Sequence, residues 1–212
     1  MIKKRGILTV VSGFAGTGKG TLMKELIKNY DNYALSISMT TRNKRPQETD
    51  GIEYFFSDQK TFKQKIEEDG FIEYACYCGN YYGTPRDYVE LMLEKGMDVI
   101  LEIEIQGALQ VKEKIPETLL LFVMPPSAKI LLDRLVGRGT ETLEVVNERM
   151  LRAVEESDGI EKYDYILVND EISVCMEEMH NIIQSEKNRA SRNLEFIEVI
   201  RQELSGLTKG DL

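Results

Sequence analysis

The sequence is poor in the residues from which metal and redox centres are usually built. It contains three cysteines and one histidine in 212 residues. Cys76 and Cys78 are spaced C-x-C rather than C-x-x-C, and no histidine lies near them. We therefore expect three ordinary thiols in a reducing compartment, rather than a zinc site or a redox pair. His180 lies in a helix-like stretch far from every motif described below, so we expect a packing or surface residue.

Long apolar segments and a surplus of positive charge are also missing. The segment Ile7–Val11 is shorter than the roughly 7–15 residues of a signal-peptide core, and no stretch approaches the roughly 20 residues that span a bilayer. The chain has 27 basic and 36 acidic residues, a net charge of −9. This balance argues against nucleic acid or a membrane as a partner bound through bulk charge. We expect a cytoplasmic globular protein that holds any anionic ligand with local cations and backbone amides.

Strand-like and helix-like segments alternate along most of the chain. Helices are expected where apolar residues recur at helical spacing, and strands where short apolar runs end at turn residues. This alternation predicts an α/β fold, a parallel sheet with helices on both faces. The expected strands are Ile7–Val11, Asp98–Ile105, Thr118–Val123 and Tyr165–Val168. The expected helices are Lys19–Tyr30, Ser127–Val136, Leu143–Ser157 and Ile172–Lys187.

The segment from Ser36 to Thr84 interrupts this alternation. Short alternating pieces surround one expected helix, Asp58–Glu68, so the segment predicts a small mixed α/β insertion. Directly after it, Thr84 and Pro85 predict a helix start, with the threonine hydroxyl as N-cap and the proline as the first helical residue. Gly96 is expected to end that helix.

A glycine-rich turn, S-G-F-A-G-T-G-K-G-T from Ser12 to Thr21, joins the first strand to the first helix. In this context glycines let backbone N–H groups turn toward phosphate oxygens, and the helix N-terminus adds partial positive charge. We predict an ATP phosphate loop in which Lys19 reaches the β- and γ-phosphates. The strict motif has Ser or Thr where this chain has Gly20, so Thr21 is the alternative hydroxyl for a metal. The loop residues expected to bind ATP are Gly13, Phe14, Ala15, Gly16, Thr17, Gly18, Lys19, Gly20 and Thr21.

Further motifs resemble the guanylate kinase family. They are S-I-S-M-T-T-R-N-K-R-P at 36–46, D-G-I-E-Y-F-F at 50–56, F-I-E-Y-A at 71–75, G-N-Y-Y-G-T at 79–84, I-Q-G at 105–107, G-R-G-T-E at 137–141 and V-N-D at 168–170. Their order and spacing match the family over nearly the whole chain. The resemblance implies transfer of the ATP γ-phosphoryl group to GMP with Mg²⁺. It also implies a P-loop core (1–36, 86–126 and 158–212), a GMP-binding domain (37–85) and a helical lid (127–157).

The resemblance assigns roles to individual residues as well. Arginines suit a monophosphate because guanidinium groups bind oxygens bidentately and stay charged. Lid arginines would close over the transferring phosphates, where catalysis is mostly positioning and charge neutralisation. The implied catalytic residues are Lys19, Arg42, Arg138 and Arg149. The implied ATP contacts outside the loop are Arg134, Arg138 and Asn169. The implied GMP contacts are Ser38, Arg42, Arg45, Tyr54, Glu73, Tyr82, Thr84, Glu102 and Glu104.

Glu73 lies in an otherwise apolar run, where a carboxylate is costly unless it is paired. Guanine presents N1–H and its 2-amino group as adjacent donors that one carboxylate can accept, whereas adenine presents an acceptor at that edge. Such mismatched polar groups discriminate strongly between substrates. Glu73 is therefore the expected base-reading residue, with the Thr84 hydroxyl beside it. A strand glutamate on a solvated face is the alternative.

Two further carboxylates are expected at the end of a core strand. Glu102 and Glu104 alternate with Ile103 and Ile105, and this period of two places both carboxylates on one face. Ligands bind at the carboxyl edge of such sheets. The resemblance gives the two glutamates contacts to GMP and, through water, to Mg²⁺, with Thr21 as the other candidate metal ligand.

Two other functions stay open from the sequence. One is a kinase for another nucleoside monophosphate such as AMP, since adenylate kinases have a similar G-K-G-T loop. The other is a non-catalytic phosphopeptide-binding module of the guanylate-kinase type, although such modules typically lack an intact phosphate loop. Beyond the matched region, apolar residues between Leu194 and Leu204 recur at near-helical spacing. They predict an amphipathic helix that docks on the body or, alternatively, makes a homodimer contact.

Overall fold

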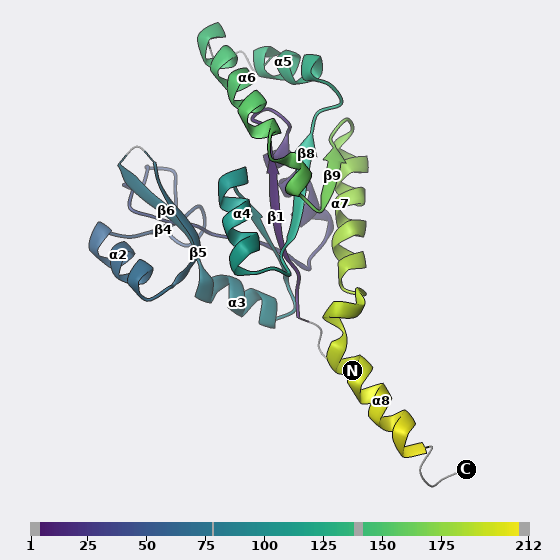
Figure 1. Cartoon of the computed structure of the whole chain (residues 1–212). Helices are drawn as coiled ribbons and strands as arrows, with labels where there is room; N and C mark the ends of the chain where they lie inside the picture. Colours follow the sequence, from purple (N-terminus) through teal and green to yellow (C-terminus); the bar gives the residue numbers. More distant parts are fainter. Residues whose placement is uncertain (1–4, 78, 138–141, 208–212) are drawn as a thin grey trace.

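A five-stranded parallel sheet forms the centre of the molecule in a computed structural model that describes residues 5–77, 79–137 and 142–207 (Figure 1). Its strand order is β2-β7-β1-β8-β9, and every neighbouring pair is parallel. The expected α/β fold is therefore confirmed. The strands are β1 (Leu8–Gly13), β2 (Tyr33–Leu35), β7 (Asp98–Glu102), β8 (Leu119–Met124) and β9 (Tyr165–Val168).

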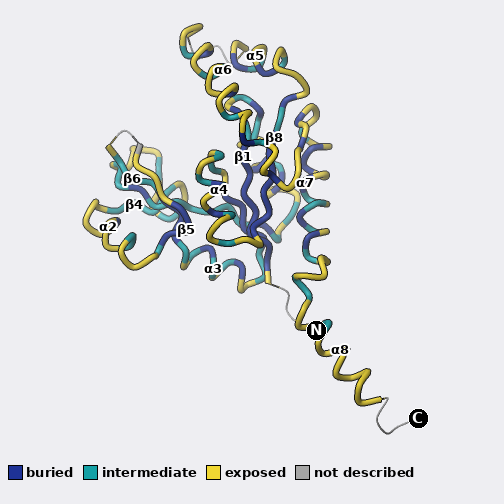
Figure 2. The backbone as a smooth tube through the Cα atoms, in the orientation of Figure 1, coloured by how far each residue is buried: buried dark blue, intermediate teal, exposed yellow. Residues whose placement is uncertain are grey.

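Helices cover both faces of this sheet because side chains of each central strand alternate between the faces. The first face is covered by α1 (Lys19–Asn29) and α7 (Ile172–Glu186), which pack on Ile7 and Val11. The second face is covered by α3 (Arg86–Glu94) and α4 (Ile105–Lys114), which pack on Leu8 and Val10. The buried residues form two apolar layers with the parallel sheet between them (Figure 2).

Two of the differences from the expected boundaries bear on the site. The strand expected at Asp98–Ile105 ends at Glu102, and helix α4, which was not expected, begins at Ile105. The helix expected to start with Pro85 begins at Arg86, while Pro85 is still the last residue of a strand. Gly96 follows the end of this helix with φ of 83°, as a C-terminal glycine should.

A second, mixed sheet carries the segment that interrupts the alternation. Its order is β4-β3-β6-β5, and helix α2 (Gln59–Glu67) packs on it through Phe62, whose ring stacks 4.3 Å from that of Phe71. Asp58 caps α2 by accepting a hydrogen bond from the Thr61 backbone N–H. The strands are β3 (Met39–Thr40), β4 (Phe55–Phe56), β5 (Phe71–Tyr77) and β6 (Asn80–Pro85).

The remaining helices lie beyond the carboxyl edge of the main sheet and along the C-terminal part of the chain. Helices α5 (Ala128–Gly137) and α6 (Leu143–Ser157) lie together at the top of Figure 1 and add Leu131, Leu135 and Val146 to the core. Two short 3₁₀ helices and a last α-helix complete the fold: η1 (Ile160–Lys162), η2 (Ala190–Arg192) and α8 (Leu194–Leu207).

His180 is a packing residue, as expected. Its ring stacks 3.7 Å from the ring of Tyr30, and its Nδ1 lies 2.8 Å from the hydroxyl of Tyr33. Among the described residues, no helix combines the length and apolar character needed to cross a membrane.

Candidate functional site

The glycine-rich turn is a tight loop between β1 and α1. Gly18 is the N-cap of α1 with φ of 86°, and a Cβ there would lie 2.8 Å from the Asn169 amide nitrogen. Gly16 has φ of 95°, and a Cβ there would lie 2.8 Å from a methyl group of Leu135. Side chains at these positions would strain the backbone and collide with neighbours. The loop therefore keeps its amides at the N-terminus of α1, where an anion is favoured.

Lys19, the first residue of α1, folds its side chain over this loop. Its ammonium group donates to the carbonyl oxygens of Gly13, at 2.5 Å, and Phe14, at 3.2 Å. Both acceptors are neutral backbone groups, and a phosphate oxygen would be a stronger acceptor for the same cation. The lysine thus lies at the position where the phosphates of a nucleotide are expected.

Phe14, expected to bind ATP as part of the loop, also has a structural role through its side chain. The side chain is 7% exposed and meets Phe122 edge-on, with ring centroids 5.1 Å apart. Phe122 in turn meets Tyr163 edge-on at 5.1 Å. Phe14 therefore fastens the loop to the apolar core, while the neighbouring Ala15 is exposed.

Asn169 holds the other side of the loop. Its side chain is 1% exposed, and its amide nitrogen donates to the Thr17 carbonyl oxygen at 2.7 Å. Arg134 of α5 donates to the Asn169 carbonyl oxygen at 2.9 Å. The predicted ATP contacts Asn169 and Arg134 thus connect the loop to α5, and Asn169 acts by fixing the Thr17 peptide.

Gly20 and Thr21 lie in the exposed first turn of α1. A Cβ on Gly20 would have no atom within 4 Å, so no close packing accounts for the glycine. Position 20 could hold the hydroxyl residue of the strict motif without a clash, and the hydroxyl of Thr21 lies one step further along the helix.

Arg42 is the centre of the predicted monophosphate site, and it is already paired with a carboxylate. Its guanidinium donates to Glu48 at 2.7 Å and lies 5.4 Å from the ring centroid of Tyr54. Glu48 also accepts from the Arg45 backbone N–H at 2.8 Å. These contacts raise the pKa of Arg42 and lower the pKa of the Glu48 carboxyl, the Arg42–Glu48 hydrogen bond being the main cause of both.

Glu48 was missed by the sequence analysis, although its signal is present: an acid three residues after Arg45 in a short loop. The predicted tyrosines do come together, since the rings of Tyr54 and Tyr82 lie 6.1 Å apart beside Arg42. Ser38 lies half-buried, and its carbonyl oxygen pairs with the backbone of Phe55. Arg45 is exposed at the edge of this group.

Glu73 and Thr84 form a buried pair between β5 and β6. The Thr84 hydroxyl donates to Glu73 Oε1 at 2.7 Å, and the glutamate is 9% exposed. Burial raises the pKa of the Glu73 carboxyl, and the threonine bond offsets this in part. A solvated strand glutamate is therefore excluded. The N-cap role expected for Thr84 is wrong, because Pro85 occupies that position and the hydroxyl serves Glu73 instead.

The two carboxylates after the core strand do not share one strand face, as had been expected. Glu102 is the last residue of β7, whereas Glu104 is the N-cap residue of α4, and both are exposed. The chain turns between them, so the period-two argument fails beyond Glu102. Both still lie at the carboxyl edge of the sheet, the same edge as the phosphate loop.

Glu156 of α6 is a further carboxylate that the sequence analysis missed. Burial and the negative charge of Glu104 raise its pKa, and Lys19 and Arg152 oppose this rise. The C-terminal end of α6 therefore brings a carboxylate close to the loop lysine. Within residues 5–77, 79–137 and 142–207, no group of three or more acidic, histidine or cysteine side chains forms a ready-made metal cage.

The structure describes two of the three predicted lid arginines. Arg149 lies half-buried in α6, and Arg134 of α5 contacts the Asn169 turn. Arg138 lies outside the described residues. Helices α5 and α6 thus stand above the phosphate loop and carry the cations expected to cover it (Figure 1).

Comparisons with known proteins agree with this arrangement. The family model described as guanylate kinase matches residues 5–186. A guanylate kinase of Oceanobacillus iheyensis is 48% identical over 192 residues, covering 91% of this chain and 93% of the relative. One from Clostridioides difficile is 47% identical over 205 residues, covering 96% and 100%. A crystal structure of guanylate kinase from Anaplasma phagocytophilum superposes with a TM-score of 0.69 at 30% identity, covering 90% of each chain.

Proposed function

The chain belongs to the guanylate kinase family, and we propose on this basis that it transfers the γ-phosphoryl group of ATP to GMP, giving ADP and GDP. The observation that supports this most directly is the buried Glu73–Thr84 pair at 2.7 Å. A buried carboxylate is costly unless a ligand or neighbour satisfies it, and guanine offers two adjacent N–H donors. The pair lies in the small mixed sheet, apart from the phosphate loop, as an acceptor-nucleotide site requires.

On the acceptor side, we assign the GMP phosphate to Arg42, Arg45, Tyr54 and Tyr82, with Ser38 beside them. Arg42 already lies over two neighbouring rings, 5.4 Å from the centroid of Tyr54 and 5.9 Å from that of Phe56. The guanidinium is thereby held in a fixed orientation before any ligand arrives. A monophosphate dianion would replace or join Glu48 as its partner, since both present oxygens to the same nitrogen atoms.

On the donor side, the ATP phosphates would lie on the loop amides from Gly13 to Thr21. Lys19 would turn from the carbonyl oxygens of Gly13 and Phe14 to the phosphates. Arg134 and the Asn169 turn lie at the adjoining side of the loop. Arg149, with Arg138, would then neutralise the charge on the transferring group. Since phosphoryl transfer asks for little covalent chemistry from the protein, positioning and charge supply most of the catalysis.

The residues present fit Mg²⁺ held mainly by ATP. Mg²⁺ keeps several waters and takes one or two protein carboxylates along with substrate phosphates. Glu102 and Glu104 are exposed at the edge of the sheet, and Thr21 offers a hydroxyl in the first turn of α1. We assign these residues to water-mediated contacts. When bound, the ion neutralises charge on the phosphates.

We also propose that the chain works as three parts: a core (1–36, 86–126 and 158–212), a GMP-binding part (37–85) and a lid (127–157) that closes on the phosphates. Closure would exclude water, which otherwise hydrolyses ATP. Leu131 and Leu135 pack in the core and against Gly16, so α5 would stay close to the loop during closure. This activity would serve purine nucleotide metabolism in the cytoplasm.

One assay tests this function: ATP and Mg²⁺ offered with GMP, dGMP, AMP or UMP in turn, with ADP release coupled to NADH oxidation. We expect rapid turnover with GMP and dGMP, because the proposed contacts read the base and the phosphate rather than the 2′-hydroxyl. AMP and UMP should be poor substrates. Preferred turnover of AMP would show a different monophosphate kinase, and no turnover of any nucleotide would favour a binding module.

A further inference from the structure

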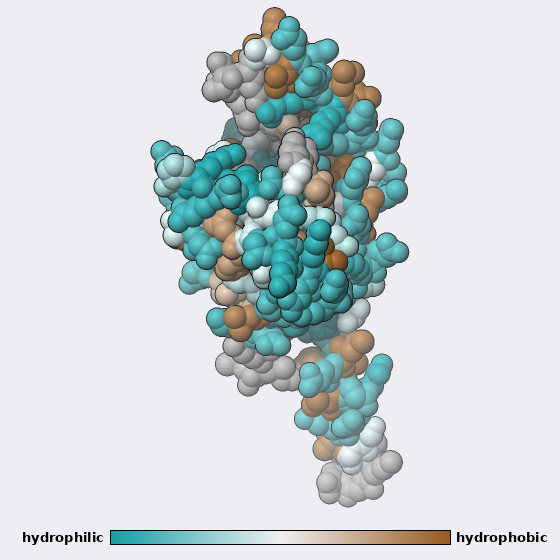
Figure 3. Space-filling model, turned by 90° about the vertical axis from the view of Figure 1, so that its left-hand side faces the viewer, coloured by the Kyte–Doolittle hydropathy of each residue, from teal (hydrophilic) through white to brown (hydrophobic). Residues whose placement is uncertain are grey.

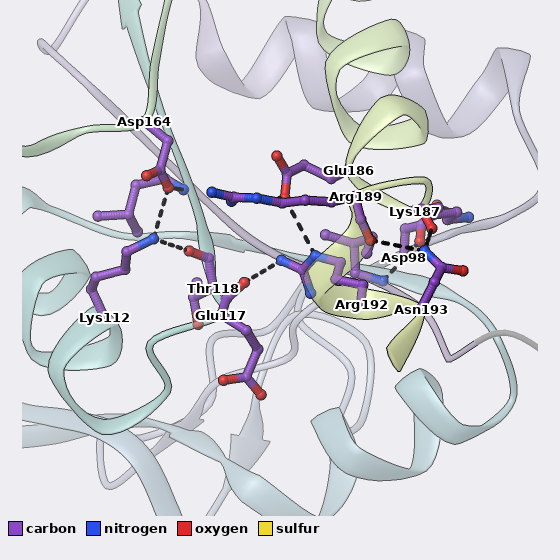
Figure 4. A network of polar contacts seen from close by, with 12 residues as sticks. Asp98, Lys112, Glu117, Thr118, Asp164, Glu186, Lys187, Arg189, Arg192 and Asn193 are labelled. Carbon is purple, nitrogen blue, oxygen red and sulfur yellow. Dashed lines mark hydrogen bonds and ion pairs between the residues drawn. The ribbon is translucent and has the colours of Figure 1, made fainter. Parts of the chain in front are cut away.

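Buried polar side chains gather at both ends of the main sheet. At the amino end Glu186 of α7 is buried, and Arg192 lies 3.3 Å from it and donates to the Glu117 carbonyl oxygen (Figure 4). These contacts fix the base of α8, which has no buried residue and leaves the body with apolar atoms exposed along it (Figures 1 and 3). The expectation that α8 docks on its own body is therefore wrong. The polar contacts at this end are structural, because they lie far from the phosphate loop.

At the carboxyl end of the sheet, Ser12 is a polar residue at an apolar position. Leu8 and Val10 of β1 point into the apolar layer under α3 and α4, and the period of two places Ser12 on the same face. Its side chain is fully buried. A buried hydroxyl needs a hydrogen-bond partner, and that of Ser12 donates to the Ile103 carbonyl oxygen at 2.6 Å. The serine therefore contacts the chain 91 residues further on.

Ile103 lies at the point where β7 separates from β1. The parallel register of the two strands ends at the pair Val11 and Glu102, so the carbonyl group of Ile103 comes directly after the last pair. Strand β1 continues to Gly13 along its other neighbour, β8. The Ser12 hydroxyl thus holds the chain that leaves β7 at the place where the sheet pairing between the two strands has ended.

The segment 102–104, held in this way, carries both carboxylates at the edge of the sheet. Ile103 stands between Glu102, the last residue of β7, and Glu104, the N-cap of α4, and both glutamates are exposed. Burial and the charge of Glu104 raise the pKa of Glu156, while Lys19 lowers it. The segment therefore brings a carboxylate into the neighbourhood of the loop lysine.

The same segment also reaches the proposed guanine site. A Cβ on Gly107 of α4 would lie 3.3 Å from the Ile103 side chain and 3.7 Å from Glu73 Oε2. Gly107 thus packs between the segment and the buried glutamate. Contacts lead from Ser12 through Ile103 and Gly107 to Glu73, that is, from the phosphate loop to the residue expected to read the base.

We propose that Ser12 is a positioning residue for phosphoryl transfer. Its hydroxyl fixes the segment with Glu102 and Glu104 to the phosphate loop, and thereby fixes the separation of the donor and acceptor sites. This inference rests on the proposed kinase function, in which the γ-phosphate of ATP must lie in line with the phosphate of GMP. A misplacement of about 1 Å in such a site can lower the rate by about 10²-fold.

Loss of this hydroxyl should affect the alignment of the substrates more than the binding of ATP. The phosphate loop has other supports, since Phe14 packs in the core and Asn169 donates to Thr17. In Ser12→Ala we expect kcat to fall by about 10- to 100-fold, while KM and the calorimetric Kd for ATP change by less than about twofold. A collapse of the loop would instead weaken ATP binding.

Two further variants separate the hydrogen bond from packing. Ser12→Cys keeps the shape of the side chain, but its S–H is a weak donor, so it should lose kcat as Ser12→Ala does. Thr9→Val is the matched control. Thr9 lies on the same strand and is fully buried, and within the described part of the chain its hydroxyl has no hydrogen-bond partner. Its replacement should leave kcat at the wild-type value.

Hydrogen exchange of the full chain tests the contact without turnover. In Ser12→Ala the amides of residues 103–107 should exchange faster, because the segment opens more easily, whereas the amides of α1 should keep their wild-type protection. Unchanged exchange at 103–107 would overturn the inference, as would a kcat within about twofold of the wild type.

Two other results would also overturn it. One is an equal loss of kcat in Thr9→Val, and the other is a loss of ATP affinity in Ser12→Ala that matches the loss of kcat. A wild type that failed to phosphorylate GMP would overturn the proposed function instead, and the exchange measurement would still decide whether Ser12 holds the segment.

Discussion

Replacement of Glu73 by glutamine should lower kcat/KM for GMP while raising the stability of the fold at neutral pH. The opposite signs separate base recognition from stability. Glu73 is buried, its Oε1 accepts from the Thr84 hydroxyl at 2.7 Å, and its Oε2 lies toward Gly107, where a Cβ would be 3.7 Å away. Glutamine has the same shape and keeps one acceptor oxygen. Its NH₂ group, however, presents a donor where guanine also presents one.

The expected loss of GMP turnover follows from these groups. A hydrogen bond to a charged group contributes about 1.5–3 kcal/mol, and a buried donor left unsatisfied costs about 1–3 kcal/mol. Together they amount to about 2.5–6 kcal/mol in the transition-state complex, or roughly 10²- to 10⁴-fold in kcat/KM. For AMP, whose edge presents an acceptor there, the variant should be no worse than the wild type, so the preference for GMP should collapse.

The stability of the same variant should rise at neutral pH. Burial raises the pKa of the Glu73 carboxyl. A carboxyl whose folded-state pKa lies above its unfolded value favours folding at low pH, and this contribution is lost as pH rises through the folded pKa. At neutral pH the ionised group therefore opposes folding, and neutral glutamine relieves it. The difference in Tm between variant and wild type should shrink as pH falls and Glu73 becomes protonated.

Steady-state kinetics with GMP and AMP, and thermal unfolding between pH 4 and neutrality, check both parts. Glu67→Gln is the matched control, since it removes a carboxylate of the same type from the exposed side of α2. It should change neither the substrate preference nor the pH dependence of Tm. A Glu73→Gln enzyme that keeps the wild-type ratio of GMP to AMP turnover would refute the base-reading role.

Three further outcomes are expected. Arg149→Ala should lower kcat by about 10²-fold or more, with KM for GMP changed far less, because this arginine is expected to act on the transferring group; an unchanged kcat would show that Arg149 has no catalytic role. Gly20→Ser should leave turnover intact and raise Tm slightly, since the position is open and serine is the better helix former by a few tenths of a kcal/mol; a large loss of activity would show that the loop needs glycine there. Asp98→Ala should lower the free energy of unfolding by about 3–5 kcal/mol in urea titrations, because the fully buried carboxylate accepts from the Ile7 N–H, Asn32 and Gln184 and pairs with Lys187 at 2.7 Å; a loss below about 1 kcal/mol would mean that these contacts contribute little.

The sequence predicted best where one local pattern decides the structure. The phosphate loop, its strand and its helix follow from glycine spacing and apolar periodicity, and β8 and β9 lie within one residue of their expected bounds. The short strand β2 went unpredicted because three residues carry no usable period. Helix α4 went unpredicted because Glu102 and Glu104, alternating with two isoleucines, imitate a strand that in fact ends at Glu102.

Long-range partners explain the other differences. Thr84 has the local signature of an N-cap, but a carboxylate eleven residues earlier takes its hydroxyl. Phe14 is unremarkable in sequence, and only the fold shows that it packs on Phe122. The direction of α8 depends on Arg192 reaching Glu117, 75 residues away in the chain. None of these long-range contacts could be predicted from neighbouring residues in the sequence.

The ion pair between Glu48 and Arg42 affects which ligands can enter the proposed acceptor site. Glu48 pairs with the arginine that we propose binds the phosphate, so an incoming ligand would take part in an anion exchange rather than fill an empty position. A phosphate dianion can compete for the guanidinium, because it brings more charge and more acceptor oxygens than the carboxylate it displaces. Guanosine, which lacks the phosphate, has nothing to offer in this exchange and would leave the Arg42–Glu48 pair closed. If the proposed site is correct, the enzyme would thereby distinguish a nucleotide from its nucleoside before the base is read.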